Sequence, residues 1–151
     1  IVMLLERLEE SNAIIGNFMK GFILTDEVKE KVKKTQTAVN ELVKNEGILR
    51  MDKNAVEKLF REHQQKYNFI EFMGLIDSKG YLTFSTVEVP ENHRDASAKP
   101  YFIKACQGEA YVSEEYISVA TNNYNISVTV PFQRGGIFGG LIIADININE
   151  N

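Results

Sequence analysis

Five apolar runs separated by polar turns fill most of the second half of the chain, and they constrain the fold more than any other feature. The runs cover residues 69–76, 81–89, 111–120, 124–132 and 137–148. Several of them alternate apolar and polar residues with a period of two, which is typical of strands that have one face in a core. Small polar turns allow neighbouring strands to pair antiparallel. The pattern therefore predicts a five-stranded antiparallel sheet.

Helical segments precede the sheet. Apolar residues recur every three or four positions in residues 1–24, which indicates a helix. A second helical stretch begins at Thr25 and Asp26, which supply N-cap chemistry, and ends at Gly47. Asp52 is placed to cap a further helix. The apolar seam of the second helix is narrow, so it can pack against the domain's own sheet or against a second copy of the chain.

We expect one domain with two parts, an N-terminal helical stalk (1–47) and a unit that contains the sheet (48–151). With 151 residues the chain is long enough to bury a core. Five strands cannot bury both faces of their sheet alone, so the leading helices cover one face. A short aromatic helix, capped by Asp95 or Ser97 and ended by Gly108, lies over the other face. This arrangement creates a pocket between the short helix and the sheet.

Groups that support catalysis or metal binding are scarce. Cys106 is the only cysteine, which excludes an intramolecular disulfide and a thiolate metal cluster. It shares a helix face with Phe102, so we expect a buried core thiol. His63 and His93 lie far apart in the sequence and have no metal-binding spacing. Because no nucleophile–base pair and no phosphate-binding loop is visible, we expect no enzyme activity in this chain, no metal and no cofactor.

Charge and hydropathy limit the partners. A net charge of -4 and a pI of about 5.3 give a nucleic-acid partner little electrostatic support. No run approaches the roughly 20 apolar residues that cross a bilayer. The chain begins with Ile1 rather than Met, so we expect a fragment of a longer protein, in which a membrane segment can flank this sequence.

Asp145 is the most informative candidate for the pocket. It lies deep in the apolar run GLIIADI, and a buried carboxylate needs a partner. That partner can be a ligand amine, Lys99 or a backbone donor. Lys99 is either a ligand-facing cation or an exposed helix residue, and Tyr101 is either a pocket wall or a core aromatic.

Three further residues complete the predicted site. Tyr116 and Ser118 have the same parity on the strand after the short helix, so they face the same side of the sheet. They line the pocket if that side is the pocket side; otherwise Tyr116 packs under the stalk. Arg94 is either a solvated loop cation or a lid contact. The predicted ligand-binding residues are Lys99, Tyr101, Tyr116, Ser118, Asp145 and Arg94.

The order of several motifs resembles the Cache family of sensor domains. Two helices are followed by GLIDSKGYLTFST, D-x-x-x-K-P-Y-F, G-x-x-Y-x-S, SVTVPF and GGLIIADI. Cache domains are the extracytoplasmic, PAS-like domains of bacterial and archaeal chemoreceptors, sensor histidine kinases and cyclic-dinucleotide enzymes. The resemblance covers nearly the whole chain. It implies an α+β fold, a PAS-like five-stranded antiparallel sheet with a long N-terminal helix and a short pocket-capping helix, in a single-Cache arrangement or as half of a double one.

The resemblance also implies roles for the site residues. The family often has an R-x-W-Y element at the start of the pocket helix, a Tyr on the next strand and an Asp at the end of the last strand. In amino-acid-binding members the Arg and the aromatics hold the ligand carboxylate, and the Asp holds its amine. Here Lys99, Tyr101 and Phe102 occupy the R, W and Y places. Tyr116 falls near the strand Tyr, and Asp145 matches the final Asp. Lys99 keeps the charge without the bidentate fork of arginine, and Phe102 lacks the hydroxyl.

From the resemblance we expect an extracytoplasmic small-molecule-sensing domain of a transmembrane signalling receptor. The expected ligand is a small polar metabolite, such as a carboxylate or an amino acid. We further expect a homodimer through the N-terminal helix, a membrane tether in the full-length protein, and a kinase or cyclic-dinucleotide output domain outside this chain. The alternative is a structural dimerisation or relay module that binds no ligand directly. The protein's own side chains would then fill the pocket.

Overall fold

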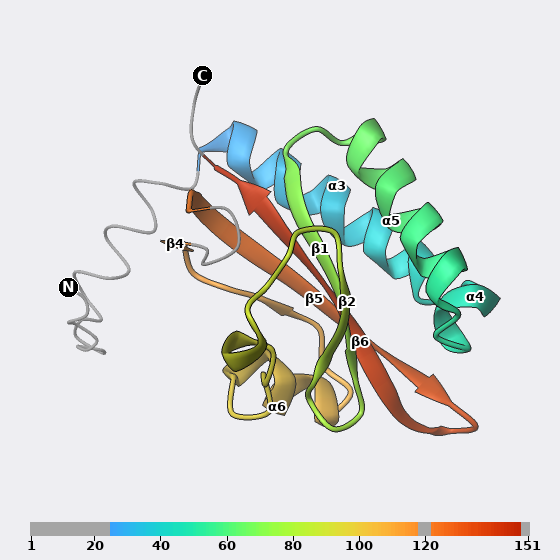
Figure 1. Cartoon of the computed structure of the whole chain (residues 1–151). Helices are drawn as coiled ribbons and strands as arrows, with labels where there is room; N and C mark the ends of the chain where they lie inside the picture. Colours follow the sequence, from blue (N-terminus) through green and yellow to red (C-terminus); the bar gives the residue numbers. More distant parts are fainter. Residues whose placement is uncertain (1–24, 118–121, 149–151) are drawn as a thin grey trace. The chain divides into compact units, whose positions relative to one another are not determined.

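The computed structural model describes residues 25–117 and 122–148, which are drawn in colour in Figure 1. The chain divides into two compact units, Ile1–Lys31 and Val32–Asn151, and the second unit contains the whole sheet. The helix predicted for residues 1–24 lies outside the described residues. No helix among the described residues is long and apolar enough to cross a membrane.

Two helices before the sheet begin where the sequence predicts. Helix α3 (Asp26–Leu42) begins after Thr25, whose Oγ1 accepts a hydrogen bond from a first-turn N–H at 3.2 Å. Helix α5 (Lys53–Lys66) begins after Asp52, whose Oδ1 accepts from two first-turn N–H groups at 3.1 and 3.4 Å. Both starts are therefore determined by local capping chemistry.

The predicted end of the first of these helices is wrong. Helix α3 ends at Leu42, and a separate short helix, α4 (Glu46–Leu49), follows. The Oδ1 of Asn45 accepts from the Gly47 N–H at 2.8 Å, so the side chain of Asn45 starts a new helix instead of continuing the old one. Gly47 is required for a different reason: a Cβ added there would lie 2.6 Å from the Cβ of Ala55, so a larger residue would separate α4 from α5.

The strands form one antiparallel sheet in the order β2-β1-β6-β5-β3, and β4 also pairs with β5. Their bounds are β1 (Ile70–Asp77), β2 (Leu82–Ser85), β3 (Tyr111–Val112), β4 (Tyr116–Ile117), β5 (Tyr124–Arg134) and β6 (Ile137–Asn147). The antiparallel α+β architecture predicted from the sequence is confirmed. The turn between β5 and β6 is also as predicted, because Gly135 and Gly136 adopt φ values of 61° and 83°.

The predicted third strand, residues 111–120, is interrupted. Its described residues form the short strands β3 and β4, with Ser113 at the break. The Ser113 N–H donates to the Ser127 carbonyl at 2.9 Å, but the Ser127 N–H donates at 2.8 Å to the Ser113 hydroxyl oxygen and not to a carbonyl. A side-chain oxygen thus takes over one position of the ladder, which ends the regular pairing.

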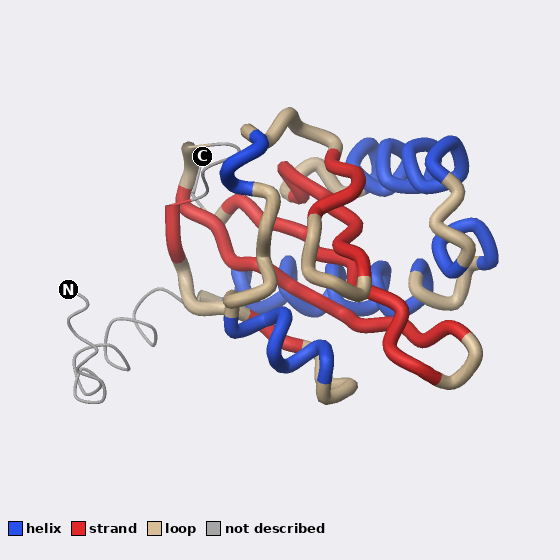
Figure 2. The backbone as a smooth tube through the Cα atoms, turned by 60° about the horizontal axis from the view of Figure 1, so that its bottom comes forward, coloured by secondary structure: helices blue, strands red, loops and turns tan. Residues whose placement is uncertain are grey.

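The two faces of the sheet are covered as predicted. Figures 1 and 2 show α5 and the second-unit part of α3 on one side of the sheet and α6 on the other. On the first side, the buried Phe60 ring of α5 lies 5.8 Å from the ring of Phe84 in β2. On the second side, Leu141 and Ile143 of β6 join the core that contains Phe102 of α6.

Helix α6 (Pro100–Cys106) follows a 3₁₀ turn, η1 (Glu91–His93), and its N-cap is Lys99. The prediction that Asp95 or Ser97 caps this helix is wrong. The Ser97 N–H and hydroxyl both donate to Asp95 Oδ1, at 2.9 and 2.7 Å, so these two residues satisfy each other within a loop turn.

The prediction that Cys106 is a core thiol is also wrong. Phe102 and Ala105 are buried, whereas Cys106 is exposed at the last position of the helix. The apolar face of this short helix is narrow, so one turn beyond Phe102 only Ala105 still points at the sheet. Gly108, with φ of 82°, then ends the segment as predicted.

Candidate ligand pocket

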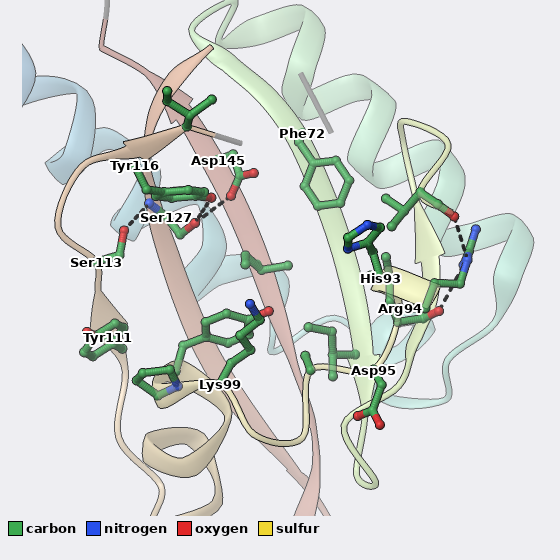
Figure 3. Close-up of a pocket in the computed structure, with 18 of the residues that line it drawn as sticks. Phe72, His93, Arg94, Asp95, Lys99, Tyr111, Ser113, Tyr116, Ser127 and Asp145 are labelled. Atoms are coloured by element: carbon green, nitrogen blue, oxygen red, sulfur yellow. Dashed lines mark hydrogen bonds between the residues drawn. The ribbon is translucent and has the colours of Figure 1, made fainter. Parts of the chain in front are cut away.

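A pocket of about 630 Å³ lies between the central strands of the sheet and residues 91–117, which contain η1, α6 and the edge strands β3 and β4 (Figure 3). Its volume falls in the range of roughly 300 to 1,000 Å³ that small-molecule sites occupy. The residues that line it are Phe72, Ile76, Leu82, Val89, Asn92, His93, Arg94, Asp95, Ala96, Lys99, Pro100, Tyr101, Tyr111, Ser113, Glu114, Glu115, Tyr116, Ile117, Ser127, Ile143 and Asp145. The pocket predicted between the short helix and the sheet is therefore present.

The strand register places two polar residues, Asp145 and Ser127, side by side in this pocket. Asp145 of β6 lies between Phe72 of β1 and Ser127 of β5, each of which is its direct cross-strand partner. Side chains of directly opposed residues point to the same face of a sheet. Asp145 and Ser127 are 4% and 2% exposed, so the pocket has a buried carboxylate beside a buried hydroxyl.

Hydrogen bonds connect these two residues to β4. The Ser127 hydroxyl donates to Asp145 Oδ1 with an Oγ–Oδ1 distance of 2.7 Å. The Tyr116 hydroxyl forms a short hydrogen bond with the same Ser127 Oγ, and both bonds are drawn in Figure 3. We refer to Tyr116, Ser127 and Asp145 together as the polar floor. Buried polar groups at fixed positions in a cavity are what orient a ligand.

Burial and the charge of Asp145 keep the neighbouring tyrosines protonated. Burial, and secondarily the Asp145 carboxylate, raises the pKa of Tyr101 to about 12. The same two causes, in the same order, raise the pKa of Tyr116. Burial also raises the pKa of Glu115. At neutral pH both phenols are therefore neutral and can donate or accept hydrogen bonds.

The opposite wall of the pocket is tied to the β1–β2 hairpin. The Arg94 guanidinium donates from Nε to the Val89 carbonyl at 3.0 Å and from Nη1 to the Leu82 carbonyl at 3.1 Å. The Ala96 N–H donates to the Gly80 carbonyl at 2.7 Å. Arg94 thus lines the pocket but uses its donors on the main chain, and it stabilises the wall of the pocket.

Five of the six predicted site residues line the pocket. Tyr101, Tyr116 and Asp145 are partly or fully buried, whereas Lys99 is exposed. The fifth is Arg94, and Ser118 lies outside the described residues. Sequence reasoning missed Ser127 and Ser113. For Ser127 a usable signal existed, because the hydroxyls of the run SVTV interrupt an apolar strand. Among the described residues, no group of three His, Cys, Asp or Glu side chains is arranged to hold a metal ion.

Comparisons with known proteins identify the fold. No protein-family model matches the chain, and no curated protein matches it. The ligand-binding domain of the Campylobacter jejuni chemoreceptor Tlp3, solved with 4-methylisoleucine, superposes with a TM-score of 0.64 at 16% identity, covering 80% of this chain and 52% of that one. The ligand-binding domain of the Pseudomonas fluorescens chemoreceptor CtaA, solved with L-valine, superposes with a TM-score of 0.64 at 18% identity. The match covers 89% of this chain and 62% of that one. The chain has the fold of a chemoreceptor sensor domain.

The expected resemblance to Cache-type sensor domains is thereby confirmed for the fold. A third solved structure with this sensor fold is the extracellular domain of rpHK1S-Z16, a protein assigned as a histidine kinase. It gives a TM-score of 0.65 at 15% identity and covers 93% of this chain. The chain spans 52%, 62% and 58% of the lengths of these three domains. At such identities the comparison establishes the fold, and the ligand has to be argued from the pocket.

Proposed function

We propose that the chain is the small-molecule-sensing domain of a signalling receptor and that the ligand binds between α6 and the sheet. The observation that carries this proposal is the pocket of about 630 Å³ with the carboxylate of Asp145 at its polar floor. The protein's own side chains leave this volume unfilled, which favours a sensor over a relay module that binds nothing. A cavity of this size that combines a buried carboxylate with apolar wall residues is suited to bind a small molecule.

The chemistry of the pocket favours a small metabolite that carries an ammonium group and an apolar part. Asp145 supplies a negative charge for the ammonium group, and Tyr101 stands beside it as an amphipathic wall. Phe72 and Ile143 give the same cavity an apolar surface. Lys99 lines the pocket and is exposed, so it is available to a ligand carboxylate. The amino-acid ligands of the Tlp3 and CtaA domains support an amino acid or a related amine.

The receptor context belongs to the same proposal. We infer an extracytoplasmic location, a membrane tether in the full-length protein, a homodimer through the N-terminal helix, and an output domain such as a kinase or a cyclic-dinucleotide enzyme outside this chain. The chemoreceptor domains and the extracellular domain of rpHK1S-Z16 support this context. A ligand can shift the signalling equilibrium only by its difference in affinity for the two states of the receptor.

A calorimetric screen tests the proposal. Amino acids, simple amines and simple carboxylates are titrated into the wild-type protein, Asp145→Asn and Lys99→Ala. We expect Asp145→Asn to weaken binding of amine-bearing ligands by tenfold or more, because it removes the charge that the ammonium group needs. Lys99→Ala should weaken only ligands that carry a carboxylate. Lys104→Ala is the matched control, since Lys104 is an exposed residue of the same helix and pairs with Glu109 at 3.5 Å.

Two outcomes would refute the proposal. The first is that a folded wild-type protein binds no member of the three ligand classes. The second is that Asp145→Asn and Lys99→Ala both bind every ligand as the wild type does. In either case the pocket is not the sensing site, and the relay module becomes the better hypothesis.

A further inference from the structure

The break between strands β3 and β4 brings an acidic residue, Glu115, to the pocket. Residues 113–117 all line the cavity, although successive side chains of a regular strand point to opposite faces of a sheet. The interruption at Ser113, where a side-chain oxygen takes over one position of the ladder, removes this alternation. Glu115 therefore lines the same cavity as its neighbour Tyr116, which Figure 3 shows beside Asp145.

The Glu115 carboxylate has no partner among the residues that the structure describes. It is half-buried, and it forms no hydrogen bond or ion pair with any of them. Burial raises the pKa of this carboxyl group, which means that its charge is disfavoured in its surroundings. A charge removed from water needs a compensating group. Since the described side chains supply none, a cationic group of a ligand is suited to this position.

The charge of the whole lining agrees with a ligand that has more than one positive charge. The acidic residues that line the cavity are Asp95, Glu114, Glu115 and Asp145, and the basic ones are Arg94 and Lys99. Four acidic residues against two basic ones leave an excess of two negative charges when His93 is counted as neutral. An amino acid with an apolar side chain has no net charge and leaves this excess uncompensated.

We propose that Glu115 is a second cation-binding residue of the pocket and that the ligand carries two ammonium groups on an alkyl chain. One ammonium group binds at Asp145 and the other at Glu115, and the methylene chain between them lies against the apolar surface of Phe72 and Ile143. A simple diamine and a basic amino acid share this chemistry. In the amino acid, the exposed Lys99 is available to the carboxylate. The inference rests on the proposed function, in which an ammonium group binds at Asp145.

Two matched pairs of probes test the second cation site by calorimetry. Cadaverine is compared with pentylamine, and lysine with norleucine, because the members of each pair differ only in the second ammonium group. We expect the wild type to prefer the dicationic member of at least one pair by roughly tenfold or more, the effect of one hydrogen bond between charged groups. In Glu115→Gln this preference should fall to about twofold or less, with pentylamine and norleucine bound as by the wild type. Lys99→Ala distinguishes the two sources, because it should weaken lysine but not cadaverine.

Two further variants separate the charge of Glu115 from its packing and from the charge of the protein as a whole. Glu115→Asp keeps the carboxylate on a side chain that is shorter by one methylene group, so it should retain most of the preference. Glu109→Gln removes the same charge at an exposed position outside the pocket lining, where Glu109 pairs with Lys104 at 3.5 Å. Because exposed charges are screened by solvent, this control should keep the wild-type preference.

The outcomes distinguish this inference from the proposed function. A wild type that binds both members of each pair equally overturns the inference, and so does a Glu115→Gln variant that keeps the wild-type preference. An equal loss of preference in Glu109→Gln and Glu115→Gln overturns it as well. In all three cases the amine site still stands if Asp145→Asn weakens pentylamine or norleucine. If none of the probes binds the wild type, the amine site of the proposed function fails together with the inference.

Discussion

Arg94 and Leu82 are joined by two hydrogen bonds of opposite direction. The Leu82 N–H donates to the Arg94 carbonyl at 2.9 Å, and Arg94 Nη1 donates to the Leu82 carbonyl at 3.1 Å. The second bond uses a carbonyl of strand β2, and Arg94 Nε reaches the Val89 carbonyl at 3.0 Å. Arg94 thus fastens a wall of the candidate pocket to strand β2 at the edge of the sheet. The pocket owes part of its shape to a side chain that is engaged with the main chain rather than with a ligand.

Arg94→Ala should destabilise the protein by about 1 to 3 kcal/mol, because two main-chain carbonyls lose charge-assisted donors. Arg94→Lys should recover little of this loss, since one ammonium group cannot reproduce the fork of the guanidinium. Urea unfolding followed by circular dichroism measures both. Arg50→Ala is the control. Arg50 forms a solvent-exposed ion pair with Glu46 at 3.4 Å, so this substitution should change the free energy of unfolding by less than about 0.5 kcal/mol. An Arg94→Ala variant as stable as Arg50→Ala would show that the hydrogen bonds from Arg94 to the Val89 and Leu82 carbonyls are not needed for stability.

Gly140→Ala should be among the most damaging single substitutions in the sheet. Gly140 has φ of 147°, and a Cβ there would lie 2.4 Å from the carbonyl oxygen of Ile76 in the neighbouring strand. We expect a loss of at least about 3 kcal/mol, because the backbone of β1 must shift. Gly108→Ala is matched for positive φ, at 82°, but an added Cβ there meets nothing within 4 Å, so only about 1 kcal/mol of backbone strain is expected. Equal thermal midpoints for the two variants would contradict this account.

Glu71→Gln should loosen the end of the sheet. The Glu71 carboxylate accepts from the side-chain amides of Asn123, at 3.1 and 3.2 Å, and of Asn125 and Asn147. A glutamine puts an amide donor where donors already converge, so we expect a loss of about 1 to 3 kcal/mol. Hydrogen exchange of the β5 and β6 amides measures the local effect. Glu57→Gln, in an exposed pair with Arg61 at 3.7 Å, should leave exchange as in the wild type.

Tyr101 should make stability fall at alkaline pH. Its pKa is raised from 10.0 to about 12 in the folded protein, with burial as the larger cause. Above pH 10 the unfolded chain loses the phenol proton while the folded chain keeps it, so the stabilising contribution is complete below that pH and is lost as the pH rises towards 12. Tyr101→Phe should therefore flatten the decline measured by urea unfolding up to about pH 11.5, by roughly 1 to 2 kcal/mol. Tyr124→Phe, at an exposed position, should keep the wild-type slope.

Much of the local structure could be read from the sequence because it depends on neighbouring residues. Thr25 and Asp52 start their helices through side-chain caps, and Gly135 and Gly136 form the hairpin turn. Apolar runs between polar turns identified the long strands β1, β5 and β6. Asp145 could be singled out as a candidate pocket residue because a lone carboxylate in an apolar run needs a partner, and it lines the pocket. The resemblance to Cache-type sensors rested on the same motifs, and the fold confirms it.

Other features depend on contacts that are distant in sequence. Cys106 was expected inside and is exposed, because the side of a short helix that meets the sheet is decided by packing. The need for a glycine at position 47 comes from the close approach of Ala55, which belongs to helix α5. The strand predicted from residue 111 is broken because Ser113 bonds with its side chain to Ser127, which is fourteen positions away. None of these partners is visible in a local pattern.

The sequence by itself determined that helices precede the strands, that the sheet has two covered faces, and that Asp145 is a candidate residue of the pocket. Only the tertiary structure decided that Ser127 and Phe72 flank Asp145. Their meeting depends on strand register, which shifts between Ile70 and Phe72 in β1 and between Phe132 and Gln133 in β5. A shift of one residue turns every following side chain to the other face, and no local rule fixes where such a shift occurs. The buried position of the Asp145 carboxylate was predictable from its apolar run, whereas its pairing with the Ser127 hydroxyl was decided by the register.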